Sequence, residues 1–198
     1  MRDMLLVVAC MLLTATIVLY MRNIIAKGVT PNPVTFFIRL VVSIFNCFSY
    51  FEVVHRDNLK TSVTVISAIG LLVIFSYAAA KGKFTKLNWV VIFCAIAASI
   101  IGILWRLGIG GDIVANLLLQ GVMLLAFWPS IDGVLAGRSK EKPLPWVCAT
   151  LCYVAMVLAI LMDWKTGSAY QLVHPIVSGI FGNGALTAAV LWSNRKKD

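Results

Sequence analysis

Seven long apolar stretches occupy most of this 198-residue chain. An α-helix rises about 1.5 Å per residue, so roughly 20 apolar residues cross the ~30 Å hydrocarbon core of a bilayer. By this test the sequence predicts seven membrane-spanning helices, at residues 4–20, 34–54, 61–80, 87–105, 113–134, 145–162 and 170–192. The connections are short and only 13% of the residues are charged. We therefore expect a single all-α membrane domain, residues 1–198, with the bilayer as its main partner.

The basic residues lie mainly in alternate connections. The loops after the first, third and fifth stretches and the C-terminal tail carry eleven of them: Arg22, Lys27, Lys81, Lys83, Lys86, Arg138, Lys140, Lys142, Arg195, Lys196 and Lys197. The opposite side carries five: Arg2, Arg56, Lys60, Arg106 and Lys165. Because Lys and Arg are retained on the cytoplasmic side during insertion, we expect the N-terminus outside and the C-terminus in the cytoplasm. The net charge of +9 then reflects orientation in the membrane and does not indicate a nucleic-acid partner.

The last three stretches resemble the first three at an offset of about 110 residues. Tyr20 matches Trp128, residues 33–36 match residues 143–146, and residues 66–70 match residues 176–179. Residues 1–83 and 108–198 thus form two three-helix repeats, and residues 84–107 form a linker helix between them. One extra helix gives both repeats the same orientation, so we expect parallel repeats about an axis along the membrane normal.

This 3+1+3 order resembles the SWEET sugar transporters and the wider PQ-loop family. Trp128-Pro129-Ser130-Ile131, followed by a basic loop and Pro145-Trp146, is similar to the second PQ-loop element of that family, with Ser in place of Gln. The first copy has Tyr20-Met21-Arg22-Asn23 and no proline there. The resemblance implies a transporter that moves a small solute by alternating access at the repeat interface. Pro129 is then either a hinge, since proline removes a helix hydrogen bond, or the end of its helix.

The resemblance also implies where the solute binds. SWEET-type transporters use an asparagine three residues before a glycine in the third helix of each repeat. Here the matching positions are Ser67 before Gly70 and Ile176 before Gly179. One hydroxyl and one isoleucine would leave most hydroxyls of a hexose unpaired, at about 1–3 kcal/mol each. We therefore expect a smaller or less polar solute, and facilitated diffusion because no acid lies at the middle of a span.

Six polar residues inside the apolar stretches are candidate substrate-binding residues: Ser67, Asn46, Asn183, His174, Asn116 and Gln120. Asn116 and Gln120 are one helical turn apart and share a face. Each amide could instead join two helices by a hydrogen bond. His174 is either an interfacial histidine or a protonatable gate.

Two charged residues are candidate gate residues. Arg39 lies one to two turns inside its predicted helix. Its head group either reaches the phosphate layer or pairs with Asp132 in a cytoplasmic latch between the repeats.

Enzyme chemistry is not expected. The sequence has only two histidines, His55 and His174, and no motif for a metalloprotease, a nucleophile elbow or a phosphate loop. No cofactor or metal site is predicted. The alternative function is a non-transporting PQ-loop-like receptor or an assembly subunit, with a second copy or a partner membrane subunit on the Gly-rich last helix. The lack of a targeting extension favours a bacterial inner membrane.

Overall fold

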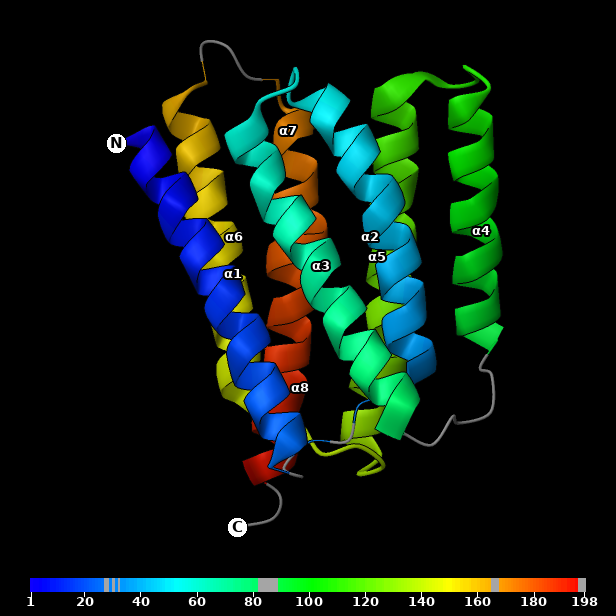
Figure 1. Cartoon of the computed structure of the whole chain (residues 1–198), viewed down its shortest axis with the longest axis vertical. Helices are drawn as coiled ribbons and strands as arrows, with labels where there is room; N and C mark the ends of the chain where they lie inside the picture. The colour runs from blue at the N-terminus through cyan, green and yellow to red at the C-terminus, as the bar shows by residue number, and fades with distance from the viewer. Residues whose placement is uncertain (27–28, 30, 32, 82–88, 165–167, 196–198) are drawn as a thin grey trace.

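The computed structural model describes the chain except residues 27–28, 30, 32, 82–88, 165–167 and 196–198. The described residues are 87% helical and contain no strand. In this part of the chain, seven helical spans stand side by side, and the two chain ends lie at opposite ends of the bundle (Figure 1). Each span is long and apolar enough to cross a membrane, which indicates a multi-pass integral membrane protein.

Six spans are single helices: α1 (Arg2–Ile25), α2 (Pro33–Val53), α3 (Asn58–Lys81), α4 (Trp89–Arg106), α5 (Gly111–Leu135) and α6 (Pro143–Met162). The seventh consists of α7 (Tyr170–Val173), the π-helix η1 (His174–Gly182) and α8 (Asn183–Arg195). The seven predicted stretches are thereby confirmed. The largest difference is at the end of α1, which extends to Ile25 instead of residue 20.

Local sequence signals explain several helix starts. Proline opens α2 at Pro33 and α6 at Pro143, where its missing N–H has no helical partner to lose. The Asp57 carboxylate caps α3, since its Oδ1 accepts from the backbone N–H groups of Leu59 (3.0 Å) and Lys60 (3.1 Å).

Pro129 lies inside α5, which continues to Leu135. The expectation that this proline ends its helix is therefore wrong. Whether α5 bends at Pro129 during function stays a prediction.

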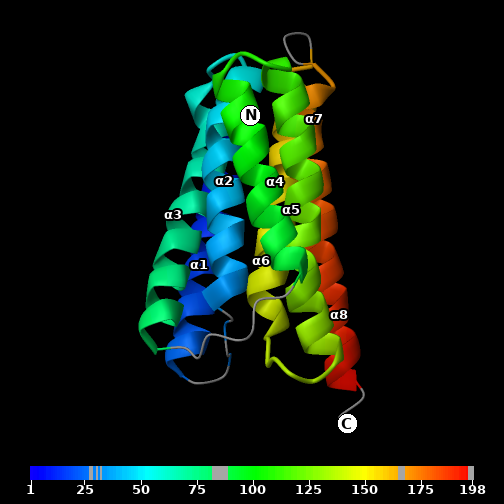
Figure 2. The ribbon, with the colours of Figure 1, turned by 90° about the vertical axis from the view of Figure 1, so that its right-hand side faces the viewer.

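We refer to α1, α2 and α3 as the first helix group and to α5, α6 and the seventh span as the second, with α4 beside them. α3 packs against α1 and α2, and the seventh span packs against α5 and α6. Between the groups, α1 lies along α6 and α2 lies along α5 (Figure 1). α4 packs against α5 and α2; it lies at the right-hand edge of the bundle in Figure 1 and faces the viewer in Figure 2.

We call the end of the bundle that holds Arg2 the N-terminal end and the end that holds Arg195 the C-terminal end.

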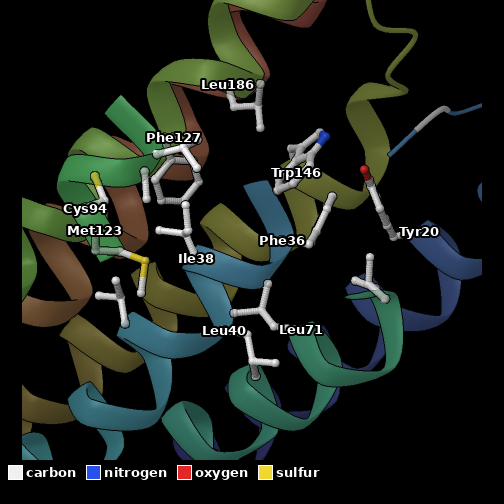
Figure 3. Close-up of a cluster of buried hydrophobic side chains, with 14 of the residues drawn as sticks. Tyr20, Phe36, Ile38, Leu40, Leu71, Cys94, Met123, Phe127, Trp146 and Leu186 are labelled. Atoms are coloured by element: carbon white, nitrogen blue, oxygen red, sulfur yellow. The ribbon is translucent and has the colours of Figure 1, made fainter. Parts of the chain in front are cut away.

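Two apolar clusters stabilise the bundle. The larger cluster includes Tyr20, Phe36, Phe127 and Trp146 (Figure 3), and a second cluster includes Leu6, Tyr50 and Met156. On α2 the first cluster stops at Val42 and the second starts at Tyr50, which leaves polar Asn46 between them.

Some predictions fall on residues that the structure does not describe. These are the repeat boundary between residues 83 and 84 and the basic residues Lys27, Lys83, Lys86, Lys165, Lys196 and Lys197. The described basic residues expected in the cytoplasm all lie at or beyond helix ends on the C-terminal end of the bundle: Arg22, Lys81, Arg138, Lys140, Lys142 and Arg195.

Candidate functional site

A cavity of about 70 Å³ lies inside the bundle, with space for roughly five water molecules. Both helix groups form its wall, and no described residue of α4 lines it. Much of the wall is apolar or aromatic. Its polar side chains come from both groups: Thr16 on α1, Arg39, Ser43, Asn46, Thr64 and Ser67 on α2 and α3, and His174, Ser178 and Asn183 on the seventh span.

Arg39 is the charged residue on this wall. It is 7% exposed, and its guanidinium carbon lies 4.2 Å from the centroid of the Phe127 ring and 5.4 Å from that of Trp146. Its Nε and Nη1 are buried and have no hydrogen-bond partner among the described residues. The expectation that its head group reaches the phosphate layer is therefore wrong. A cation with unused donors lies against the cavity instead.

Asn46 is the centre of a polar network that joins α2, α5 and η1. Its Oδ1 accepts from Asn116 Nδ2 (3.1 Å) and from Gln120 Nε2 (2.6 Å). Asn116 Nδ2 also donates to Ser49 Oγ at 3.0 Å, and Ser178 Oγ donates to Gln120 Oε1. All of these residues are buried. Asn46 thus both lines the cavity and links helices, so the two interpretations of this amide are compatible.

His174 lies in the same network at the start of η1. Its Nδ1 is 3.2 Å from Asn46 Nδ2 and 3.1 Å from Gln120 Oε1, whereas its Nε2 is buried without a partner in the described structure. The rings of Tyr50 and Tyr153 pack around it, with centroids at 5.0 and 5.6 Å. With 3% exposure, His174 is a core residue, and the expectation of an interfacial histidine is wrong.

Pro175 explains part of this local geometry. Because proline has no N–H, it cannot donate to the carbonyl of Gln171 four residues earlier. That carbonyl accepts instead from the Tyr50 hydroxyl at 3.0 Å. The helix continues as the π-helix η1, a conformation that is often found at functional sites.

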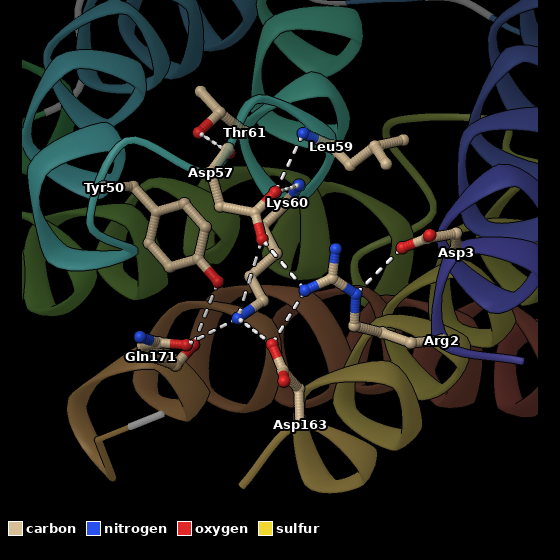
Figure 4. Close-up of polar contacts among 9 residues, drawn as sticks. All are labelled: Arg2, Asp3, Tyr50, Asp57, Leu59, Lys60, Thr61, Asp163 and Gln171. Carbon is tan, nitrogen blue, oxygen red and sulfur yellow. Dashed lines mark hydrogen bonds and ion pairs between the residues drawn. The ribbon is translucent and has the colours of Figure 1, made fainter. Parts of the chain in front are cut away.

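An ionic cluster ties the spans together at the N-terminal end (Figure 4). Asp163 Oδ2 lies 2.8 Å from Arg2 Nη1 and 3.4 Å from Lys60 Nζ. Asp57 Oδ2 lies 3.5 Å from Arg2 Nη1 and 3.8 Å from Lys60 Nζ, and Lys60 also donates to Gln171 Oε1 at 3.1 Å. The Lys60 side chain is only 4% exposed. The cluster therefore joins α1, α3, α6 and α7 with a largely dehydrated cation at its centre.

A different arrangement lies at the C-terminal end, where Glu141 precedes α6. Its carboxylate accepts from the Tyr20 hydroxyl (2.8 Å) and from Trp146 Nε1 (3.2 Å). Burial raises the pKa of Glu141 to about 7, although these two hydrogen bonds favour the charged form. The Tyr20 and Trp146 rings are in contact, with centroids 5.3 Å apart, and both line the cavity. A carboxyl group that titrates near neutral pH thus supports this part of the wall.

The predicted substrate-binding residues separate into two sets. Ser67, Asn46, Asn183 and His174 line the cavity. Asn116 and Gln120 do not line it but hold Asn46 and Ser178 by hydrogen bonds. Ile176, the predicted counterpart of Ser67, is not on the wall, and Ser178 occupies that role.

The predicted gate residues are not brought together. Asp132 pairs with Arg138, and its side chain is 43% exposed. Arg39 packs on aromatic rings, so the expected latch between Arg39 and Asp132 is not formed in this structure. Pro129 lies in α5 away from the cavity wall.

Sequence reasoning missed Ser43, Thr64 and Ser178 on the wall and did not assign roles to Lys60 and Glu141. A signal for part of this was available on α2. Residues 39, 43, 46 and 50 are Arg, Ser, Asn and Tyr, and their spacing of three and four places them on one helix face. A polar stripe of this kind in a membrane helix predicts the inward face.

Among the described residues, no group of three or more His, Cys, Asp or Glu side chains is placed to hold a metal ion. The site offers a buried cation, neutral hydrogen-bonding groups and aromatic rings. This set can bind a small molecule without covalent chemistry.

Comparison of the chain with protein-family models, curated proteins and solved structures finds no match. The functional argument therefore depends on the geometry of the site.

Proposed function

We propose that this protein is a small-solute membrane transporter of the SWEET-like 3+1+3 type, a facilitator with alternating access between its two three-helix groups. The observation that carries the proposal is the internal cavity, whose polar side chains come from both groups. A solute bound there touches both halves, so a movement of one half against the other can expose it to either side of the membrane.

The packing supports two related halves. α5, α6 and α7 begin 109, 110 and 112 residues after α1, α2 and α3. The first helix of each half lies along the second helix of the other, and the third packs between its two neighbours. Ser67 and Ser178, one from the third span of each half, both line the cavity. A twofold axis along the bundle accounts for these pairs.

The charge distribution supports the orientation. With the C-terminal end in the cytoplasm, the ionic cluster of Arg2, Lys60, Asp57 and Asp163 lies at the outer end. This conformation then has its outer end closed by ion pairs. We also propose that the membrane is a bacterial inner membrane.

The solute is expected to be small. Hydrogen bonding alone does not argue against a sugar, because the wall has more polar groups than Ser67 and its sequence counterpart Ile176 would supply. The volume of the cavity does argue against a sugar, because about 70 Å³ is too small for a hexose with all its hydroxyl groups in this conformation.

Alternating access can be tested by cysteine labelling. In a variant with the five native cysteines replaced by alanine, we would introduce Ser67→Cys and apply a membrane-impermeant thiol reagent to either face of oriented vesicles. The matched control is Ser49→Cys, because Ser49 is fully buried in the adjacent network but does not line the cavity. Cysteine at 67 should react from both faces, and cysteine at 49 from neither.

Labelling of position 67 from one face only, together with no solute flux in proteoliposomes, would contradict the transporter. It would favour the alternative, a receptor or an assembly subunit with a fixed, one-sided binding site.

A further inference from the structure

We infer that the solute of this cavity is a small organic carboxylate and that Arg39 binds its negative charge. The inference rests on the proposed function only in that both concern the same cavity. It adds a substrate class, because the sequence and the proposed mechanism leave the charge of the solute open.

The first observation is that Arg39 forms no ion pair among the described residues. The ion pairs in the described structure use the acidic residues elsewhere: Asp57 and Asp163 with Arg2 and Lys60, Glu52 with Arg56, and Asp132 with Arg138. None of these pairs includes Arg39, although arginine stays protonated in proteins.

Glu141 is the acid whose charge acts on Arg39 most directly. It does not form an ion pair with Arg39, and its two oxygens are already used by the Tyr20 hydroxyl and the Trp146 indole. With a pKa of about 7, Glu141 is also only about half ionised at neutral pH. Glu141 therefore gives the guanidinium no hydrogen-bond acceptor and at most a partial counter-charge.

The second observation is that the unused donors belong to a built site. Arg39 is 93% buried, lines the cavity, and has two guanidinium nitrogens, Nε and Nη1, without partners among the described residues. Stacking on Phe127 offsets only part of the penalty of burying a cation, because a ring supplies no hydrogen-bond acceptor in the guanidinium plane. An anion with oxygen acceptors supplies both the charge and the acceptors.

The wall around Arg39 favours a carboxylate over a bulkier or more highly charged anion. Phe36, Phe127 and Trp146 lie within 6 Å of the guanidinium carbon and provide flat apolar surfaces. Among the described residues, no second Lys or Arg lines the cavity. One positive charge among aromatic rings fits a monoanion with a small apolar body, and the neutral groups of Ser67, Asn46 and His174 remain for its other polar atoms.

The test compares two probes of nearly equal shape that are small enough for the cavity, acetate and neutral acetamide, with pyruvate as a second carboxylate. The thermal unfolding of the full chain in mild non-ionic detergent would be followed against probe concentration. We expect a carboxylate to raise the unfolding temperature and acetamide not to do so. Arg39→Met should weaken carboxylate binding by roughly tenfold or more, since a hydrogen-bonded charge is lost. Arg138→Met is the matched control, because Arg138 is exposed at the same end of the bundle.

Arg39→Lys covers the case in which Arg39→Met does not fold, because it keeps the charge but loses the planar donors; we expect intermediate binding. Equal stabilisation by acetamide, no stabilisation by any carboxylate, or a carboxylate effect that survives Arg39→Met would overturn the inference. So would stabilisation that depends on Arg39 but is produced only by inorganic phosphate or by phosphatidylglycerol. Carboxylate binding that requires Arg39, without flux in proteoliposomes, would support the site while refuting transport. Flux of neutral solutes only would support transport while refuting the carboxylate site.

Discussion

Gly179 permits the close approach of η1 to α6, and its replacement tests this packing directly. A Cβ added at Gly179 would lie 2.2 Å from Tyr153 Cγ and 2.7 Å from Tyr153 Cβ. To reach 3.4 Å, the lower limit of ordinary contact, these atoms would have to separate by about 1.2 Å. The blocking atoms are at the base of the tyrosine side chain, so a rotamer change cannot remove them. The helices themselves must move apart.

Gly184 provides the matched control, because a Cβ there would meet nothing within 4 Å. Gly→Ala substitution adds up to about 1 kcal/mol of helix propensity at either site, and this term cancels in the comparison. The difference is then the overpacking term, typically about 1–3 kcal/mol, and we expect the upper end because the backbone must shift. For a chain of this size, 3 kcal/mol corresponds to a difference of roughly 6–12 °C in unfolding temperature.

The assay is thermal unfolding of Gly179→Ala and Gly184→Ala in the same detergent. Gly70→Ala is a useful intermediate, because its Cβ would meet Ile17 Cδ1 at 2.3 Å, the movable end of a flexible side chain. We expect stability to decrease in the order Gly184→Ala, Gly70→Ala, Gly179→Ala. If Gly179→Ala unfolds at the same temperature as Gly184→Ala or above it, the proposed close packing of η1 on α6 is refuted.

Three further substitutions test the two ends of the bundle and the polar network between them. Lys60→Met should destabilise the protein in thermal unfolding by about 1–3 kcal/mol, because it leaves carboxylates without their buried cation, whereas Arg56→Met, at a 71% exposed side chain, should change stability by less than about 0.5 kcal/mol. Gln120→Leu should lower the free energy of unfolding by about 1–3 kcal/mol, because Ser178 loses its hydrogen-bond acceptor. An unchanged unfolding temperature would show that the polar network is dispensable. The raised pKa of Glu141 means that the folded chain keeps a proton that the unfolded chain has lost, so stability should fall as pH rises from about 4.5 to about 7, by at most about 3 kcal/mol. Glu141→Gln should remove this pH dependence, and a retained slope would assign it to another group.

The spans could be predicted from the sequence because the thickness of the bilayer sets one length for every element. α1 extends beyond the predicted end because hydropathy falls at Arg22, whereas the helix continues to Ile25. Past the apolar core the backbone still satisfies its N–H and C=O groups within the helix. Hydropathy therefore marks where a span enters the membrane more reliably than where its helix stops.

The environments of Arg39 and His174 were misjudged for one reason. Their depth was inferred from distance to the helix end, but burial depends on which side of the helix faces the bundle. Arg39 lies on the same α2 face as Asn46, and His174 contacts that amide across the bundle. Which residues a side chain contacts depends on the tertiary structure. The sequence shows only the spacing of polar residues on α2, which indicates the face of that helix that points inward.

The glycines of the seventh span show the same limit. Gly179, Gly182 and Gly184 lie close together in the sequence, which does not show which of them permits a close helix contact. Cβ atoms at Gly179 and Gly182 would meet Tyr153 and Phe127 at 2.2 and 2.5 Å, whereas one at Gly184 would meet nothing within 4 Å. Close packing thus depends on glycine at the first two positions and not at the third.

The two ends of the bundle are held together by different chemistry, and this difference bears on how the proposed facilitator would work. At the N-terminal end Lys60 is shared between Asp57 and Asp163. A buried ion pair is only slightly more stable than its hydrated ions, so it can separate at small net free energy once water enters. At the C-terminal end Tyr20, Trp146 and Phe36 close the wall mainly by apolar contact, with Glu141 as the polar member. Exposing those rings to water costs free energy that hydration does not offset. Protonation of Glu141 removes a charge from this group of residues. In the proposed cycle, therefore, the entry of water separates the ion pairs at the N-terminal end. At the C-terminal end, solute binding at Arg39 and the protonation state of Glu141 determine whether the aromatic contacts separate.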